Sequence, residues 1–299
     1  MTSAETVHIC LEEPFRQSAA RGEHNFINLV TGVLQDAGMQ VQFCALGEAP
    51  AAGYSLSHMV QPPNARGLVF RRAYHYPFWQ IDAVAQRWHW DVARATFDPA
   101  REIPEAAGFY RFWQKRLFGE AARHARRDGF VYVPLQGQLD RARLFQSCTP
   151  FEMIEACLAH DPSRRIVATL HPSETYDPAD LKRLEALAAR HGRLTVDTGR
   201  MEHYLAGCDY VATQNSGAAF SGFFFGKPAL LFAQIDFHHI CIRAEIEALG
   251  ASFAQVAAAA PAFDRYLWWY WQEQSINAGR PEAAKKIAAR FRRFGWPIP

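Results

Sequence analysis

The 299-residue sequence has no surplus of either charge and no long apolar run. Its 32 Lys and Arg residues offset 30 Asp and Glu residues, so no global field draws it to nucleic acid or an anionic membrane. The longest apolar stretch, Ala248 to Pro261, is shorter than the roughly 20 residues that a membrane-spanning helix needs. No basic stretch followed by an apolar core opens the chain, so we predict no secretory signal and a cytoplasmic location.

Cysteine pairs and three widespread sequence signatures are also absent. The six cysteines form no C-x-x-C pair and no His–Cys cluster at zinc spacing, which predicts reduced thiols. The motifs G-x-G-x-x-G, G-x-x-x-x-G-K-[ST] and G-x-S-x-G are missing. Their absence weighs against dinucleotide dehydrogenases, P-loop NTPases and α/β-hydrolases.

The apolar pattern that is present predicts an α/β protein. A strand at 6–11, a helix at 26–34 and strands at 40–46 and 67–70 are expected first, and then a helical, aromatic and basic stretch at 74–127. The predicted strands of the second half are 130–135, 165–170, 194–196, 210–213 and 228–232, and its predicted helices are 149–159, 178–191 and 217–225. We therefore predict two Rossmann-like domains facing a cleft, at 1–127 and 128–262, and a helical segment at 263–299 that packs back across them.

Polar residues follow three predicted strands of the second half. The three loops contain Gln136-Gly137-Gln138-Leu139-Asp140, His171-Pro172 and Asn215-Ser216-Gly217, and Lys227 follows the last of them. Because the carboxyl ends of parallel strands meet at one edge of a sheet, these loops can line one pocket. There His171 and the backbone after Asn215 suit a phosphate, and Asp140 can serve as nucleophile or base. The same residue types also serve as turns, helix caps and surface ion pairs.

The series Val-Pro-Leu-Gln, His-Pro and N-S-G-x-x-F-x-G-F-F-F-G-K-P, within residues 130–240, resembles the bacterial capsular polysaccharide biosynthesis proteins, the group of the β-Kdo transferases. The resemblance implies a GT-B glycosyltransferase that takes a Kdo-like acidic sugar from a CMP-activated donor. It places the donor-binding residues in the three loops, at Gln136, Gln138, His171, Pro172, Asn215, Ser216, Gly217 and Lys227. The family's Q-x-E-D-D loop aligns with Gln136 to Asp140, where only Asp140 keeps a carboxylate. Asp140 is thus the candidate nucleophile of a retaining double displacement.

The two-domain resemblance also gives a purpose to an aromatic cluster in the N-terminal half, at Tyr74 to Trp79. Aromatic faces stack on sugar rings and arginines hold acidic groups, so the predicted acceptor-binding residues are Arg71, Arg72, Tyr76 and Trp79. Acid/base chemistry on that side is assigned to Glu23 and His24, or to His75 and Asp82.

The expected partners are a nucleotide sugar and a lipid-linked or glycan acceptor, with peripheral association with the inner membrane or a capsule assembly complex and no nucleic acid. No cofactor and no metal are expected, because CMP leaves with one phosphate and the chain has no D-x-D motif. Two alternatives stay open. The depleted acidic loop fits a non-catalytic capsule assembly or export protein, and the two-domain pattern also fits an epimerase of UDP-sugars.

Overall fold

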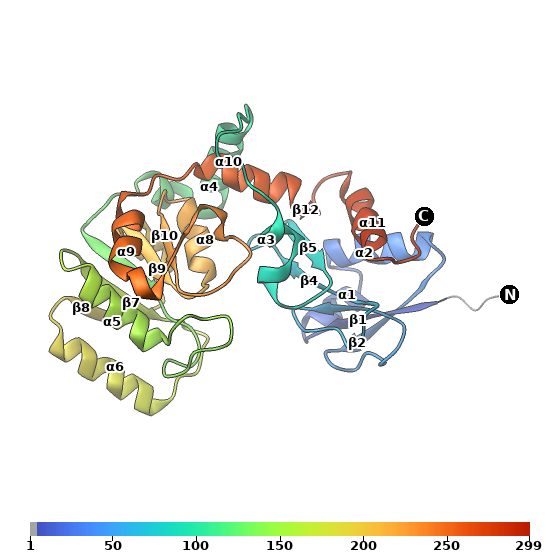
Figure 1. Cartoon of the computed structure of the whole chain (residues 1–299). Coiled ribbons are helices and arrows are strands. Elements are labelled where there is room, and N and C mark those ends of the chain that lie inside the picture. The colour runs from blue at the N-terminus through green and yellow to red at the C-terminus, as the bar shows by residue number, and fades with distance from the viewer. Residues whose placement is uncertain (1–4) are drawn as a thin grey trace. The chain divides into compact units, whose positions relative to one another are not determined.

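The computed structural model describes residues 5–299, which divide into two compact units (Figure 1). Unit 1 holds the described residues up to Ala95 together with Trp269–Pro299, and unit 2 is Thr96–Trp268. Each unit contains one six-stranded sheet whose strands are mostly parallel. The α/β class with two Rossmann-like parts, predicted from the apolar pattern, is therefore confirmed.

The sheet of unit 1 combines parallel strands with an antiparallel margin. Its strands are β1 (Thr6–Leu11), β2 (Gln40–Ala45), β3 (Tyr54–His58), β4 (Gly67–Arg72), β5 (Phe78–Asp82) and β12 (Ile276–Asn277), and its helices are α1 (Phe15–Ala20), α2 (Asn25–Asp36), α3 (Asp91–Arg94) and α11 (Ala283–Arg293). The strand order is β12-β5-β4-β3-β1-β2. Strands β2, β1, β3 and β4 are parallel, and β5 runs antiparallel to β4. This register sets Trp79 opposite Arg72, and Asp82 opposite Val69.

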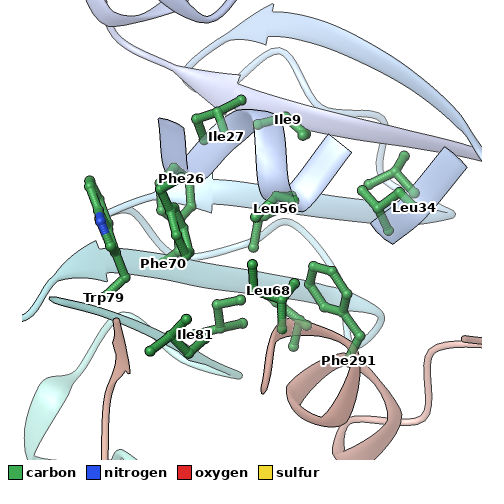
Figure 2. Packing of buried hydrophobic residues seen from close by; sticks show 14 of the residues in the cluster. Ile9, Phe26, Ile27, Leu34, Leu56, Leu68, Phe70, Trp79, Ile81 and Phe291 are labelled. Atoms are coloured by element: carbon green, nitrogen blue, oxygen red, sulfur yellow. The ribbon is translucent and has the colours of Figure 1, made fainter. Parts of the chain in front are cut away.

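The core of unit 1 lies between the sheet and helices α2 and α11 (Figure 2). Helix α2 contributes four buried side chains at helical spacing, Phe26, Ile27, Val30 and Leu34. Phe291 of α11 is buried in the same cluster. Phe26 stacks on Trp79, with ring centroids 4.5 Å apart and planes 5° apart. The C-terminal helix is thus part of the core of unit 1.

Three elements of unit 1 differ from the sequence prediction. Strand β3 lies in the Gly- and Pro-rich stretch 47–67 and is buried in the middle of the sheet. It was not predicted because Ser55 and Ser57 interrupt its apolar pattern. Strand β5 replaces the start of the predicted helical stretch, and all five of its residues are buried, so its pattern has no period. Helix α1 forms between the predicted strand at 6–11 and the predicted helix at 26–34, where no element was predicted.

The sheet of unit 2 is parallel throughout. Its strands are β6 (Phe130–Pro134), β7 (Arg165–Leu170), β8 (Leu194–Thr198), β9 (Tyr210–Thr213), β10 (Ala229–Leu231) and β11 (Ile242–Arg243), and its helices are α4 (Ala106–Arg123), α5 (Pro150–His160), α6 (Pro178–Arg190), α7 (Met201–Gly207), α8 (Gly217–Phe223), α9 (Leu249–Ala258) and α10 (Phe263–Trp268). The strand order is β11-β10-β9-β6-β7-β8. Five of these strands and the helices α5, α6 and α8 coincide with predicted elements, and their predictions are confirmed.

Successive side chains of β6 point to opposite faces of the second sheet, and both faces are buried. Val131 and Val133 belong to one cluster with buried residues of α5, α6 and α9. Tyr132 points to the other face, where its ring stacks on Tyr204 of α7 with centroids 5.6 Å apart. The helices therefore cover both faces of the sheet, and the ends of the strands are left uncovered by them.

The division between the units differs from the boundary predicted at 127/128. Helix α4, which precedes the first strand of unit 2, packs against α7 and α10. Its Tyr110 hydroxyl donates to the carbonyl of Phe223 at 2.9 Å, and its Gln114 amide donates to the carbonyl of Phe224 at 2.7 Å. Helix α4 is thus part of unit 2, which begins at Thr96. The segment 263–299 is also divided, with α10 in unit 2 and α11 in unit 1.

Candidate functional site

Three polar loops meet at the carboxyl edge of the second sheet. They follow β9, β6 and β7, which are adjacent and parallel, and they carry Asn215, Gln136 to Asp140, and His171. Neighbouring strands lie ~4.8 Å apart, so the three strand ends fall within ~10 Å of one another. The predicted convergence of these loops at one sheet edge therefore holds.

His171 presents one hydrogen-bond donor at this edge. Its side chain is exposed, and its Nδ1 atom accepts a hydrogen bond from the backbone N–H of Ser173 at 3.2 Å. Because Nδ1 is an acceptor, the ring proton of the neutral imidazole is on Nε2. A donor on Nε2 is what a phosphate oxygen requires.

Tyr176 joins the loop after β7 to the loop after β6. The backbone N–H of His171 donates to the Tyr176 hydroxyl at 2.8 Å, and that hydroxyl donates to the carbonyl of Leu135 at 3.3 Å. Leu135 directly precedes Gln136. Tyr176 was not among the predicted residues, and its only sequence signal is its place five residues after His171.

One residue of the loop from Gln136 to Asp140 is buried. Leu139 is fully buried, and its N–H donates to the Asp180 carboxylate on α6 at 3.3 Å. Gln138 and Asp140, on either side of it, are exposed. Position 139 is therefore a core position of this chain, and the carboxylate available in the loop is that of Asp140.

A cation lies against the same loop. Gly137 has a φ of +63°, in the left-handed region that favours glycine. A Cβ atom at Gly137 would meet Nη2 of Arg143 at 3.4 Å, so the guanidinium of the exposed Arg143 lies against the backbone of Gly137. Arg143 was not predicted, although it lies only three residues after Asp140.

The loop after β9 offers two amides. Ser216 is buried and its Oγ accepts from the N–H of Ala218 at 3.2 Å, which caps the short helix α8. Asn215 is half-buried, and its amide makes no hydrogen bond to any of residues 5–299. The buried Gln214 donates to the carbonyl of Cys148 at 2.9 Å, whereas its Oε1 atom has no partner among the described residues. Gln214 was not predicted, because its signal is an unpaired buried atom.

A cavity of about 200 Å³ lies at the carboxyl ends of β10 and β11, the next strands along the same edge. Its lining combines apolar residues with four polar ones, Gln146, Ser147, Gln234 and Arg243. Ser147 of the lining adjoins Cys148, which Gln214 holds. Whole-ligand pockets enclose ~300–1,000 Å³, so this cavity suits one ring of a larger ligand.

Lys227 does not belong to this edge, which corrects its predicted donor-binding role. It precedes β10 and is 2% exposed. Its ammonium donates to the carbonyls of Arg126 and Cys208, which precede β6 and β9 at the amino edge of the sheet. Burial lowers the pKa of Lys227. The side chain ties two loops together at the edge opposite the three polar loops.

Replacing Lys227 with methionine is expected to lower the free energy of unfolding by about 2–4 kcal/mol, because two carbonyls lose their donor. Urea unfolding followed by circular dichroism measures the change. The matched control is Lys182→Met, at an exposed position of α6, with an expected change within about 0.5 kcal/mol. Loss of nucleotide affinity at unchanged stability would instead return Lys227 to the binding site.

For two residues of unit 1, the predicted role on the acceptor side is wrong. Trp79 is 3% exposed and packed on Phe26, so its faces are not open to a sugar. Asp82 lies at the amino edge of the parallel strands, because β5 runs antiparallel. There it accepts hydrogen bonds from the N–H groups of Ala83 and Asp91 and pairs with Arg290 of α11 at 3.2 Å. Both residues serve the structure of unit 1.

Glu23 and His24 are used locally. Glu23 is exposed and pairs with Arg21 at 2.8 Å. His24 caps α2, because its Nδ1 atom accepts from the N–H of Ile27 at 3.3 Å. Burial, and then the charge of Arg72, lower the pKa of His24.

The remaining predicted acceptor residues lie around the turn from β4 to β5. Arg71 is half-buried, and Arg72 and Tyr76 are exposed. The Tyr76 hydroxyl accepts from the amide of Asn25 at 3.3 Å. Burial, and then the charge of Arg72, lower the pKa of His75 to about 4. The structure thus groups Arg71, Arg72, His75 and Tyr76 at the carboxyl edge of the first sheet.

Sequence reasoning missed one pair at this edge. Nδ1 of His58, at the end of β3, lies 2.8 Å from both carboxylate oxygens of Glu12, directly after β1. Glu12 carried the same signal as the loops of unit 2, a polar residue after an apolar strand. His58 could not be found in this way because β3 was not predicted.

Among residues 5–299, no three His, Cys, Asp or Glu side chains come together as ligands for a metal ion. No single helix of this part of the chain is long and apolar enough to cross a membrane. One helix pair, Ile246–Ala258 with Phe263–Glu273, reaches that length and apolar character only when its two helices are taken together, and it is bent by 94° at the break between them.

Comparisons with known proteins identify the fold. No family model and no curated protein matches this sequence. Among solved structures, the chain is similar to the KpsC beta Kdo 2,7 transferase of Thermosulfurimonas dismutans, with a TM-score of 0.51 at 11% identity over 88% of each chain. The chain has a GT-B-type fold. The KpsC beta Kdo 2,4 transferase of the same organism gives a TM-score of 0.48 at 14% identity, over 87% of this chain and 96% of that one. WaaG, a glycosyltransferase of lipopolysaccharide biosynthesis, gives 0.40 at 12% identity, over 94% and 74%.

Proposed function

We propose that this GT-B-type protein is a cytoplasmic glycosyltransferase of capsular polysaccharide synthesis. It transfers an acidic, Kdo-like sugar from a CMP-activated donor to a lipid-linked or glycan acceptor. The observation that carries the proposal is the grouping of His171, Asn215 and Asp140 on three adjacent strand ends of one parallel sheet. In open α/β sheets, this carboxyl edge is where ligands bind.

The edge offers a place for each part of CMP. The cavity beside Arg243 takes the pyrimidine ring. His171 donates from Nε2 to the phosphate, and the amide of Asn215 adds a second donor. From β10 to β7 the edge spans three strand spacings, ~14 Å, which matches an extended nucleotide sugar.

The exposed carboxylate of Asp140 supplies the nucleophile. It forms a bond to the anomeric carbon while the bond from that carbon to the phosphate oxygen breaks, and the electron pair leaves with CMP. In the second step the acceptor hydroxyl forms the glycosidic bond, its proton goes to a base, and the carboxylate leaves with its electron pair. Because one phosphate leaves, the reaction needs no divalent cation on a diphosphate.

Replacing His171 with alanine is expected to weaken CMP binding about 10- to 100-fold, since a hydrogen bond to a charged phosphate contributes about 1.5–3 kcal/mol. Isothermal titration calorimetry measures the affinity. The matched control is His191→Ala, an exposed residue that ends α6 at the amino edge of the same sheet. Equal losses in both variants would contradict a phosphate contact at His171.

The same titration distinguishes two other functions from the proposed one. Preference for UDP over CMP would identify a UDP-sugar enzyme such as an epimerase. Binding of capsular polysaccharide without any CMP binding would identify a non-catalytic assembly or export protein. The first result would replace the CMP-activated donor with a UDP-activated one. The second result would mean that the protein has no donor site.

A further inference from the structure

Unit 1 has its own group of chemically active side chains at the carboxyl edge of its sheet. Strands β1, β3 and β4 are adjacent and parallel. Glu12 directly follows β1, and His58 and Arg72 are the last residues of β3 and β4. His58 is paired with Phe70 of β4, and Ser57, one residue before it, is paired with Cys10 of β1. The three polar residues therefore share one edge of the sheet.

Glu12 orients the imidazole of His58. Both carboxylate oxygens lie 2.8 Å from Nδ1, and the His58 side chain is 12% exposed against 44% for Glu12. An Nδ1–H that donates to a carboxylate leaves the lone pair of the neutral ring on Nε2. This Nε2 atom makes no hydrogen bond to any of residues 5–299. His58 thus offers a hydrogen-bond acceptor whose direction is set by Glu12.

A second imidazole offers the opposite polarity nearby. His24 accepts at Nδ1 from the N–H of Ile27, so its ring proton is on Nε2. The phenyl ring of Phe15 packs between the two, with centroids 4.5 Å from His24 and 5.2 Å from His58. One acceptor and one donor therefore flank a half-buried aromatic ring, an arrangement that suits a polyhydroxylated ligand.

The charge at this edge is positive. Arg72 is exposed and forms no ion pair with the described residues, although its charge reaches both imidazoles. Burial lowers the pKa of His58, Glu12 raises it, and the charges of Arg71 and Arg72 lower it again, with a net decrease. His24 shifts in the same direction. At neutral pH both rings are uncharged, and Arg72 is available for an anionic group.

We propose that Glu12, His24, His58 and Arg72 form a binding site for an acidic sugar, whose carboxylate pairs with Arg72 and whose hydroxyl donates to Nε2 of His58. The site rests on the proposed function in one respect, since this sugar is then the acceptor of the transfer. Glu12 is a positioning residue, because it acts through the ring of His58. The carboxylate and the hydroxyl pattern together specify a uronic or ulosonic acid rather than a neutral hexose.

The test measures binding of methyl β-D-glucuronide to the full chain in the absence of any nucleotide. Its neutral counterpart, methyl β-D-glucoside, and acetate, which carries the charge without hydroxyls, are titrated in parallel. We expect the glucuronide to bind at least 10-fold more tightly than either. Arg72→Gln is expected to remove the preference over the glucoside, whereas Arg66→Gln, an exposed arginine at the amino end of β4, preserves it.

Nitrogen-15 NMR of the histidine side chains gives the second readout. We expect the Nδ1–H form of His58, a shift of its Nε2 resonance on addition of glucuronide, and loss of that form in Glu12→Leu, which has no hydrogen-bond acceptor. Equal binding of glucuronide and glucoside, equal binding of acetate, or an unmoved Nε2 resonance would overturn the proposal. Failure of CMP binding alone overturns the proposed function and leaves this sugar site standing, because the titration contains no nucleotide.

Discussion

Replacing Asp140 with asparagine is expected to lower the rate of sugar transfer from CMP-Kdo by about 10³-fold or more, with CMP affinity unchanged within about twofold. The side chain keeps its size and loses its nucleophile. Asp140 is exposed, so its replacement leaves the packing of the loop intact, whereas its neighbour Leu139 is held in the core. CMP release followed over time measures the rate, and calorimetry measures the affinity.

A neighbouring carboxylate provides the matched control for Asp140. Glu174 lies in the loop after β7, at the same edge of the sheet, and is exposed. Glu174→Gln is expected to keep the transfer rate within about threefold. If Asp140→Asn keeps the rate of the wild type, Asp140 is not the nucleophile. A similar loss in both variants would point to the charge of the edge rather than to a covalent step.

Replacing Trp79 with alanine is expected to lower the free energy of unfolding by about 3–5 kcal/mol. The side chain is 3% exposed, stacks on Phe26 and contacts the ring of His24 edge-on at 5.4 Å. Trp79→Phe is expected to cost only about 1–2 kcal/mol, because it keeps the stacked ring and removes an indole N–H that has no partner among the described residues. Urea unfolding followed by circular dichroism measures both changes.

Tyr76 is the control residue, because it is an exposed aromatic residue of the same cluster and does not belong to the core. It is 46% exposed, and Tyr76→Ala is expected to change the unfolding free energy by less than about 1 kcal/mol. A Trp79→Ala protein with unchanged stability and weakened sugar binding would contradict the core role of Trp79. It would support the stacking role that the sequence predicts.

The second half of the chain was the more predictable part. Its central strands are buried on both faces, so they read as apolar runs between helices, and the polar residues after them fall at one edge without further information. The sequence pattern does not show in which direction a side chain points or which groups it contacts. Lys227 was placed by its motif in the binding site, whereas its ammonium reaches two carbonyls at the opposite edge.

The first half was less predictable for two physical reasons. Serines buried in the middle of a sheet interrupt the apolar pattern of β3, and this hid His58 and with it the partner of Glu12. The antiparallel direction of β5 decides which end of that strand lies beside Arg72, and periodicity contains no direction. For the same reason Asp82 was assigned to a site, although it lies at the opposite edge. Trp79 does lie beside Arg72, but its ring is buried against Phe26, and the sequence pattern does not show that burial.

A crystal structure of the protein with CMP tests the proposed donor site most directly. We expect the phosphate within hydrogen-bond distance of Nε2 of His171 and the amide of Asn215, with the cytosine in the cavity beside Arg243. We also expect the carboxylate of Asp140 to lie at the phosphate end of the nucleotide. CMP bound away from the carboxyl edge of the second sheet, or no bound CMP at saturating concentration, would contradict the proposed donor site.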